Sequence, residues 1–334
     1  MKLRILSESD VRSVLSMADA MDIQARAFTA LAAGQSIEGL RSFAVSELPP
    51  GVAIFNPAFL KEGKGYGVKI VSDFYDNPNR GAARLSALVA LFNGETGHPR
   101  TVMEGGYLTD IRTGAGTALA ARYLARKDSR SVTIIGAGRV ARHQLQALCV
   151  ENAIETVVVS TRSRDRGEEF IGRMREGDGA PSHIRLEEDR AKAVSDADMV
   201  ICATTSPEPV FPGAALRPGT FVASVGTHSA GTREVDTETI RRARVHVIDS
   251  RTDCLAAAGD LQIPAKEGAL DLDQVSEIAD LVAGRTFGRQ SDEDITFYKS
   301  VGVPIQDLFT AQFVEKRAIE HGIGTLIDIG GDND

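Results

Sequence analysis

Residues 136–141, GAGRVA, have the residue types and spacing of a loop that binds a dinucleotide. The loop follows the apolar run Ser131–Ile135 and precedes a segment of helical period. Gly136 allows a tight turn, Gly138 lets a pyrophosphate approach the backbone, and Ala141 permits close packing of helix on sheet. The alternative is a tight turn without a ligand. The residues expected to contact the cofactor here are Gly136, Ala137, Gly138, Arg139 and Val140.

The end of the next predicted strand, Thr156–Ser160, indicates which nicotinamide cofactor is used. NAD-binding proteins place an acidic residue there for the ribose hydroxyls. This chain instead has Thr161, Arg162 and Arg164 after the strand. Because arginine suits a 2′-phosphate, we expect NADP to be preferred, with NAD also possible. The alternative is that these arginines belong to a solvated loop.

Cysteines and histidines show no pattern typical of a metal site. The three cysteines, Cys149, Cys202 and Cys254, are too few and too far apart for a zinc motif or a disulfide framework. The six histidines contain no HExxH or similar pair. We therefore expect no metal, and among the histidines only His228 is a candidate for chemistry.

The composition is that of a folded globular protein and excludes several classes of partner. The chain has 334 residues, 43% of them hydrophobic and 25% charged, and this length is typical of about two domains. The 38 Lys and Arg against 46 Asp and Glu give a net charge of -8, which disfavours nucleic acid and anionic lipid as partners. No apolar run reaches the ~20 residues that span a bilayer, and the N-terminus lacks a signal-peptide core. We expect a cytoplasmic protein without membrane association.

From residue 131 onward, short apolar runs alternate with segments of helical period, which predicts a parallel sheet. With at least five strands this is an α/β fold with a doubly wound Rossmann sheet, assigned to residues 116–302. The predicted strands are Ser131–Ile135, Thr156–Ser160, Met199–Ala203, Thr220–Val225 and Val245–Asp249.

Residues 1–115 and 303–334 are assigned to a second, smaller α+β domain. Its first part is helical from Ser9 to Ala33, with a break near Ser16. Residues 111–127 form a predicted helix rich in small residues that links the domains, and an amphipathic helix at residues 305–321 is expected to pack on this domain. The strand-like runs are Arg41–Ser46, Val52–Asn56, Tyr66–Val71 and Leu88–Phe92.

Over nearly its whole length the chain resembles the ornithine cyclodeaminase/mu-crystallin family. The resemblance implies an NAD(P)-using protein with a Rossmann domain, a substrate domain and a homodimeric assembly, so residues 1–115 and 303–334 are expected to bind substrate and to dimerise. The motifs that carry it are Gly67-Val68-Lys69, Leu108–Thr113, the glycine loop, Asp196-Ala197-Asp198 before a strand that leads to Thr204-Thr205, and Ser300-Val301-Gly302.

The resemblance implies that cations clamp the carboxylate of an α-amino or α-imino acid, and the matching residues are Arg41, Lys69 and Arg112. Arginine offers a planar fork for a carboxylate, while lysine is a point charge that can also donate a proton when its pKa falls on desolvation. Lys69 lies in an otherwise apolar strand, which favours a site role over a solvated one. Arg112 is expected near a helix start, where the macrodipole disfavours a cation, so an anionic partner is expected; the resemblance also places Arg112 at the cofactor.

The resemblance further assigns cofactor contacts to Thr204 and Ser300 and places Val301 beside the substrate, with Thr205 as an alternative to Thr204. Ornithine cyclodeaminases have an aspartate after a Gly-Gly pair that follows the fifth strand, and it handles the substrate's amino group. His228 stands at that place here. A histidine can move protons near neutral pH but cannot hold a cationic amino group as a carboxylate does.

The interpretation that follows is an oxidoreductase that reduces a small 2-imino carboxylate to an amino acid, or that runs the reverse amino-acid dehydrogenase reaction. Lys69, Arg112 and His228 are its expected catalytic residues. Because residues 51–57, GVAIFNP, contain no carboxylate, we expect a substrate with a neutral or anionic side chain. The alternatives are an ornithine cyclodeaminase that forms proline and ammonia, and a non-catalytic protein of the mu-crystallin type that binds NADP and a small carboxylate.

Overall fold

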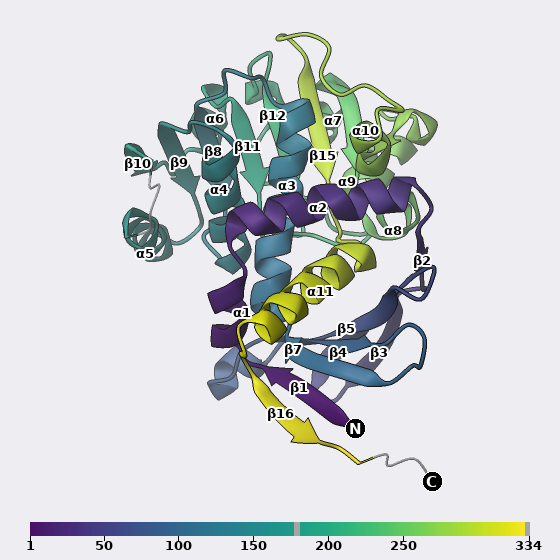
Figure 1. The fold of residues 1–334 in the computed structure, drawn as a ribbon. Helices are drawn as coiled ribbons and strands as arrows, with labels where there is room; N and C mark the ends of the chain where they lie inside the picture. The colour runs from purple at the N-terminus through teal and green to yellow at the C-terminus, as the bar shows by residue number, and fades with distance from the viewer. Residues whose placement is uncertain (177–180, 331–334) are drawn as a thin grey trace. The chain divides into compact units, whose positions relative to one another are not determined.

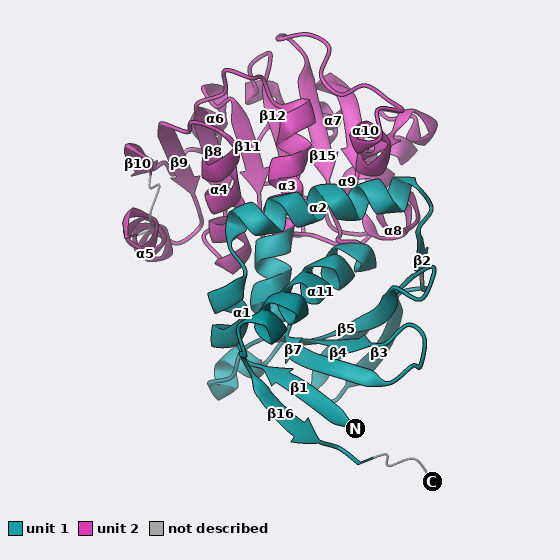
Figure 2. Ribbon diagram, viewed as in Figure 1, with its two compact units in different colours: residues 1–112, 304–334 teal, residues 113–303 magenta. Residues whose placement is uncertain are grey.

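The computed structural model describes residues 1–176 and 181–330, and the chain folds into two compact units (Figure 2). Unit 1 comprises Met1–Arg112 and Pro304–Asp334, and unit 2 comprises Thr113–Val303. Within the described residues, no helix is both long enough and apolar enough to cross a membrane.

Unit 2 is built on an eight-stranded sheet in the order β10-β9-β8-β11-β12-β15-β13-β14, and every neighbouring pair is parallel. The α/β fold class with a parallel Rossmann sheet is confirmed, and all five predicted strands are present. The strands are β8 (Ser131–Ile135), β9 (Thr156–Ser160), β10 (His183–Leu186), β11 (Met199–Cys202), β12 (Phe221–Ser224), β13 (Ala243–Ile248), β14 (Ser276–Glu277) and β15 (Ile295–Lys299).

The order of these strands creates a switch point between β8 and β11. The chain runs from β8 outward to β9 and β10, then crosses back to β11 on the other side of β8. Strands β11, β12 and β15 are buried at every residue, as expected where helices cover both faces. Loops at the carboxyl ends of β8 and β11 diverge there, which is where open α/β sheets bind ligands. The helices of unit 2 are α4 (Arg139–Glu151), α5 (Arg164–Arg175), α6 (Arg190–Ser195), α7 (Thr237–Arg242), α8 (Arg251–Ala257), α9 (Gly259–Lys266) and α10 (Ile278–Val282), with short 3-10 turns at Gly213–Ala215 and Leu272–Gln274.

Unit 1 contains a second sheet that is mostly antiparallel, with the path β16-β1-β7-β6-β5-β4-β2 and with β3 also paired to β4. The β1–β7 pair alone is parallel among the described strands of this sheet. Strands β4 and β5 are longer than predicted. The strands are β1 (Lys2–Leu6), β2 (Ser36–Glu38), β3 (Ser42–Glu47), β4 (Pro50–Leu60), β5 (Gly65–Phe74), β6 (Leu85–Phe92), β7 (Pro99–Glu104) and β16 (Thr325–Asp328), with a 3-10 turn at Asn77–Arg80.

The helices of unit 1 are α1 (Glu8–Val14), α2 (Met17–Ala32) and α11 (Pro304–Glu320). The predicted break falls at Ser16, whose hydroxyl caps α2 in a capping box with Asp19. Figure 1 shows α11 running beneath α2, and α11 also contacts β4, β5 and β6, so the C-terminal helix packs on unit 1 as predicted.

Helix α3 (Gly106–Leu124) begins five residues before the predicted start at Ile111. The cause is Glu104, whose carboxylate accepts the backbone N–H of Gly106 at 2.5 Å and of Tyr107 at 2.9 Å. These N–H groups have no partner inside the helix, so an acceptor at this place starts the helix earlier. Arg112 therefore lies in the second turn, and the expectation that it stands at the helix start is wrong.

Candidate active site

A pocket of about 260 Å³ opens at the switch point of the unit 2 sheet. Its walls come from the three loops that follow β8, β9 and β11. The residues that line it include Gly136, Ala137, Gly138, Ser160, Thr161, Arg162, Thr204 and Thr205, together with Arg166 and Arg190. The structure thus brings together most of the predicted cofactor residues of unit 2.

The glycine loop has the backbone that a dinucleotide requires. Gly136 has a φ of +113°, and a Cβ at this position would lie 2.5 Å from the Ala203 carbonyl oxygen, so a larger residue would be strained and crowded. Gly138 caps α4 with an extended backbone, and a Cβ there would meet no atom within 4 Å. Open space beside Gly138 and the backbone N–H groups in the first turn of α4 fit a pyrophosphate. Arg139 and Val140 begin this helix.

The arginines after β9 differ in their surroundings. Arg162 lines the pocket, whereas Arg164 is exposed and pairs with Glu168 at 2.9 Å and Glu188 at 3.4 Å. Arg166 and Arg190, which no sequence motif indicates, line the pocket together with Arg162. No carboxylate is among the described residues that line it. Excess positive charge therefore gathers at the ribose end of the predicted site.

Other predicted site residues of unit 2 lie in the loops that follow β11, β12 and β15. Ser300 follows β15, and its hydroxyl donates to Asp249 Oδ2 at 2.7 Å, while the Val301 N–H donates to the same oxygen at 2.9 Å. His228 lies exposed in the loop after β12. Thr204 both lines the pocket and bonds to a buried carboxylate, Glu234.

In unit 1, two of the three predicted carboxylate-binding residues, Lys69 and Arg112, pair with a buried aspartate. Lys69 Nζ lies 2.7 Å from Asp307 Oδ2, and Arg112 Nε lies 3.0 Å from Asp307 Oδ1. Gln306 Oε1 accepts a further bond from Arg112 at 2.8 Å. Lys69 and Arg112 are only 4% and 5% exposed, so neither is a solvated surface cation. The anionic partner expected for Arg112 is Asp307.

The electrostatics of this cluster favour an added anion. Burial lowers the pKa of Lys69, the charge of Arg112 lowers it further, and Asp307 only partly opposes them, so the pKa falls to about 8. Arg41 contributes to the same lowering, which places its charge near Lys69. One carboxylate thus faces at least two cations, and the cluster keeps a net positive charge.

One polar atom of the cluster, Asn56 Oδ1, has no hydrogen-bond partner among the described residues. Arg112 Nε and Asp307 Oδ1 form an ion pair at 3.0 Å, although without hydrogen-bond geometry. Asn56 on β4 lies directly opposite Lys69 on β5, so both side chains face the same side of the sheet. Buried polar groups are normally satisfied, so Asn56 Oδ1 indicates a place for a ligand group that donates a hydrogen bond.

Sequence reasoning missed Asp307, Gln306 and Asn56. A signal for Asp307 exists: it lies at the same helical stripe as Ala311, Val314 and Ala318, which are all buried. A carboxylate in the apolar stripe of an amphipathic helix predicts a buried cation opposite it. Asn56 gives no comparable signal, because its pairing with Lys69 depends on strand register.

The Asp196-Ala197-Asp198 motif stabilises the fold and does not line the pocket. Asp198 Oδ2 accepts the backbone N–H of Arg130 at 2.8 Å and of Ser131 at 2.9 Å, and its other oxygen pairs with Arg126 and Arg217. The motif therefore fastens the amino ends of β8 and β11, the edge opposite the pocket.

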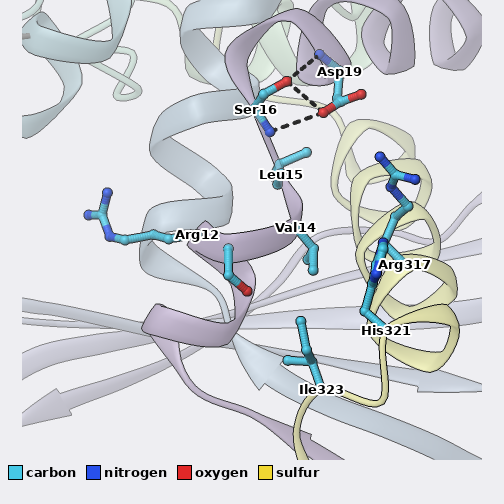
Figure 3. A pocket seen from close by; sticks show the side chains of 9 residues that line it. Arg12, Val14, Leu15, Ser16, Asp19, Arg317, His321 and Ile323 are labelled. Carbon is cyan, nitrogen blue, oxygen red and sulfur yellow. Dashed lines mark hydrogen bonds between the residues drawn. The ribbon is translucent and has the colours of Figure 1, made fainter.

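A further cavity of about 360 Å³ lies in unit 1 between α1, the start of α2 and the end of α11 (Figure 3). Three of its polar residues, Arg12, Ser16 and Asp19, already have partners. Ser16 and Asp19 bond to each other, and Arg12 pairs with Glu8 at 2.6 Å and stacks on the Tyr107 ring. Figure 3 shows Arg12 pointing away from Arg317 and His321. We assign no ligand to this cavity.

The chain is similar to proteins of one family. The model of the ornithine cyclodeaminase/mu-crystallin family matches residues 1–322. The Delta(1)-pyrroline-2-carboxylate reductase of Bacillus cereus is 30% identical over 97% of this chain and 99% of its own length. The structure of the Thermococcus litoralis Delta(1)-pyrroline-2-carboxylate reductase in complex with NADH and L-proline is 36% identical, with a TM-score of 0.92 over 96% of this chain and 99% of the other. An archaeal alanine dehydrogenase dimer with bound NAD is 30% identical, with a TM-score of 0.91 over 99% of this chain and all of the other.

Proposed function

The chain belongs to the ornithine cyclodeaminase/mu-crystallin family, and from that premise we propose that it is an oxidoreductase that reduces a small 2-imino carboxylate to an amino acid. The reverse reaction is an amino-acid dehydrogenase reaction. Relatives that are named pyrroline-2-carboxylate reductase and alanine dehydrogenase support both directions. A cyclic imine such as Δ1-pyrroline-2-carboxylate is the first candidate substrate.

One observation carries the proposal: the buried cluster in unit 1 keeps a net positive charge around Lys69 and Arg112, and unit 2 contains a dinucleotide pocket. A substrate carboxylate would restore the charge balance around Lys69 and Arg112 and supply acceptor oxygens. We assign the substrate to unit 1 and the cofactor to unit 2.

In the proposed mechanism, the protein supplies charge, orientation and a proton. Arg41, Lys69 and Arg112 hold the substrate carboxylate, and Asp307 keeps the latter two cations in place. When bound, the nicotinamide supplies a hydride for the α-carbon of the imine. The imine nitrogen needs a proton in the same reaction, and Lys69, with a pKa of about 8, can release one near neutral pH. His228 and water are the other sources.

The charge of the cluster also bears on the substrate side chain. Residues 51–57 contain no carboxylate, but Asp307 lies in the cluster and is engaged by Lys69 and Arg112. Because the cluster stays net positive, a second ammonium, as in ornithine, would be repelled. We propose a substrate with a neutral or anionic side chain.

For the cofactor, we propose that NADPH is preferred and that Arg162, Arg166 and Arg190 bind the 2′-phosphate. Arg164 is removed from this set, because its charge is engaged by Glu168 and Glu188. The absence of a carboxylate among the described pocket residues supports this preference.

We further propose that the protein forms a homodimer through unit 1. Strand β3 and its flanks expose large apolar side chains, with Leu40 85%, Val45 76% and Leu48 91% exposed. A monomer rarely exposes such a patch. The dimeric state of the related alanine dehydrogenase supports this assembly. Light scattering on the wild type and on Val45→Lys, which places a charge in the patch, tests it: a wild-type monomer contradicts the proposal.

The activity is tested by incubating the protein with Δ1-pyrroline-2-carboxylate and NADPH or NADH and following loss of the nicotinamide absorbance. We expect net cofactor oxidation and formation of proline. Ornithine is assayed in parallel for ammonia and proline. Ammonia release without net redox change identifies a cyclodeaminase, and cofactor binding without turnover across a panel of imines identifies a binding protein.

A further inference from the structure

A buried carboxylate in unit 2, Glu234, joins two loops at the carboxyl edge of the sheet. Its Oε1 accepts the N–H of Thr204 at 2.6 Å and the Thr204 hydroxyl at 2.8 Å. Its Oε2 accepts the N–H of Gly226 at 2.7 Å and the hydroxyl of Ser224 at 2.9 Å. Thr204 follows β11 and Gly226 follows β12, so one side chain fastens the loops after two adjacent strands.

Thr204 is a wall of the dinucleotide pocket and is tightly confined. A Cβ on Gly226 would collide with the Thr204 backbone and lie 2.6 Å from Glu234 Oε1, and a Cβ on Gly136 would lie 3.4 Å from Thr204 Cγ2. The loop after β11 therefore packs between the glycine loop and the loop after β12. A shift of Thr204 would change the shape of the pocket directly.

Glu234 is itself held by a second carboxylate and a lysine. Asp260 Oδ1 accepts the backbone N–H of Glu234 at 2.7 Å and of Val235 at 3.1 Å. Lys299 Nζ on β15 lies 2.8 Å from Asp260 Oδ2 and donates to Ser224 Oγ at 3.1 Å and to the Thr227 carbonyl at 2.7 Å. All three charged side chains are 0% exposed. Such a network is costly to bury, so its geometry must be satisfied as a whole.

We propose that Glu234 is a positioning residue of the dinucleotide site, which fixes Thr204 and Gly226 in the conformation that binds the cofactor while Asp260 and Lys299 hold Glu234 in place. This inference rests on the cofactor part of the proposed function. Four donors point at the Glu234 carboxylate, so Gln would place an amide NH2 against donors and lose at least one bond.

Asp198 provides a matched control on the same sheet. It is also a buried carboxylate that accepts two backbone N–H groups, but at the amino edge, away from the pocket. If Glu234 only stabilises the fold, Glu234→Gln and Asp198→Asn should behave alike. If Glu234 positions the pocket wall, only Glu234→Gln should weaken cofactor binding.

The experiment measures the dissociation constants of NADH and NADPH by fluorescence titration, the melting temperature, and KM for cofactor and imine. We expect Glu234→Gln to weaken cofactor binding about tenfold and to raise the cofactor KM more than the imine KM. Asp198→Asn should lower the melting temperature and change the cofactor dissociation constants less than twofold. Equal dissociation constants in the two variants, at a temperature where both are folded, overturn the proposal.

A gentler pair of variants covers the case in which Glu234→Gln does not fold. Ser224→Ala removes one donor to Glu234, and Ser131→Ala removes the corresponding donor to Asp198. We expect a few-fold weaker cofactor binding only in Ser224→Ala, and equal binding in the two overturns the proposal. A wild-type protein that binds neither cofactor instead overturns the proposed function, so the two failures are distinguishable.

Discussion

Each unit contains a buried cluster of lysine and carboxylate side chains, and the two clusters have opposite charge balance. In unit 1, Lys69 and Arg112 face the single carboxylate of Asp307. In unit 2, the single cation Lys299 lies among the carboxylates of Asp260 and Glu234. The same residue types therefore leave an excess of positive charge in one place and an excess of negative charge in the other.

Hydrogen bonding separates the two clusters in the same way. The unit 1 cluster leaves Asn56 Oδ1 without a hydrogen-bond partner, while within the described chain no buried polar atom of Lys299, Asp260 or Glu234 lacks one. Unused donors and acceptors indicate a ligand site, and a fully satisfied network indicates a scaffold.

The pKa values of the two lysines follow this difference. Burial and Arg112 lower the pKa of Lys69 to about 8 despite Asp307. Burial also acts to lower the pKa of Lys299, but Asp260 and Glu234 outweigh it, so this pKa lies above its ordinary value. Lys69 can therefore exchange a proton near neutral pH, and Lys299 stays charged.

The largest effect is expected from Lys299→Met, which leaves two buried carboxylates without their cation. Removing one partner of a buried ion pair typically costs about 3–5 kcal/mol. Urea unfolding measures the loss of unfolding free energy. The matched variant Lys69→Met leaves Asp307 paired with Arg112, so it should cost much less stability. Equal losses in the two variants would show that charge balance does not separate the clusters.

A smaller effect, on turnover, is expected from Lys69→Ala and Arg112→Ala. Each removes a charge-assisted partner of the substrate carboxylate worth ~1.5–3 kcal/mol, which corresponds to a fall of roughly 10- to 150-fold in kcat/KM. The fold and the glycine loop should persist. Lys64→Ala is the control, because Lys64 is an exposed lysine next to β5 that pairs with Glu62. Unchanged kcat/KM in either site variant removes that residue from the site.

Much of unit 2 was predictable because its signals are local. The strands at Ser131–Ile135 and Thr156–Ser160 match the structure residue for residue, since apolar β-branched runs bounded by a glycine loop have few alternatives. Strand β15 was missed, although every residue in it is buried. Its place between β12 and β13 depends on pairing with distant segments.

The residues of the candidate site also divide into those that the sequence could predict and those that it could not. Lys69 and Arg112 could be selected from the resemblance and from a lysine in an apolar strand. Asn56 could not, because a strand register places it opposite Lys69. The Arg166 and Arg190 side chains line the cofactor pocket from α5 and α6, and nothing in their local sequence indicates that both helices border it.

In unit 1, excess positive charge indicates a ligand site. Variants of the arginines that line the cofactor pocket test whether the same holds in unit 2. Replacing Arg162 and Arg166 together with Ala should raise the NADPH KM roughly tenfold, ~1.4 kcal/mol, and leave the NADH KM nearly unchanged. Arg164→Ala should change neither, since its charge is engaged on the protein surface. Equal effects on both cofactors would assign the arginines to general stability.

A last prediction sharpens the contrast between the two lysines through pH. Lys69 is charged below a pH of about 8, so kcat/KM for imine reduction should be highest there and fall about tenfold per pH unit above it. The folded protein also binds this proton more weakly than the unfolded chain, whose lysine pKa is near 10.5. The Lys69 contribution to unfolding free energy should therefore be most unfavourable below pH 8 and improve between pH 8 and 10.5.

Lys69→Arg separates Lys69 from other sources of this pH dependence, because arginine keeps the charge but does not titrate in this range. We expect lower activity without the fall near pH 8. The imine nitrogen titrates too, and a fall that comes from the substrate remains in Lys69→Arg. If the variant keeps the wild-type profile, the proton comes from His228, water or the substrate, and Lys69 then acts only as a cation that binds the substrate carboxylate.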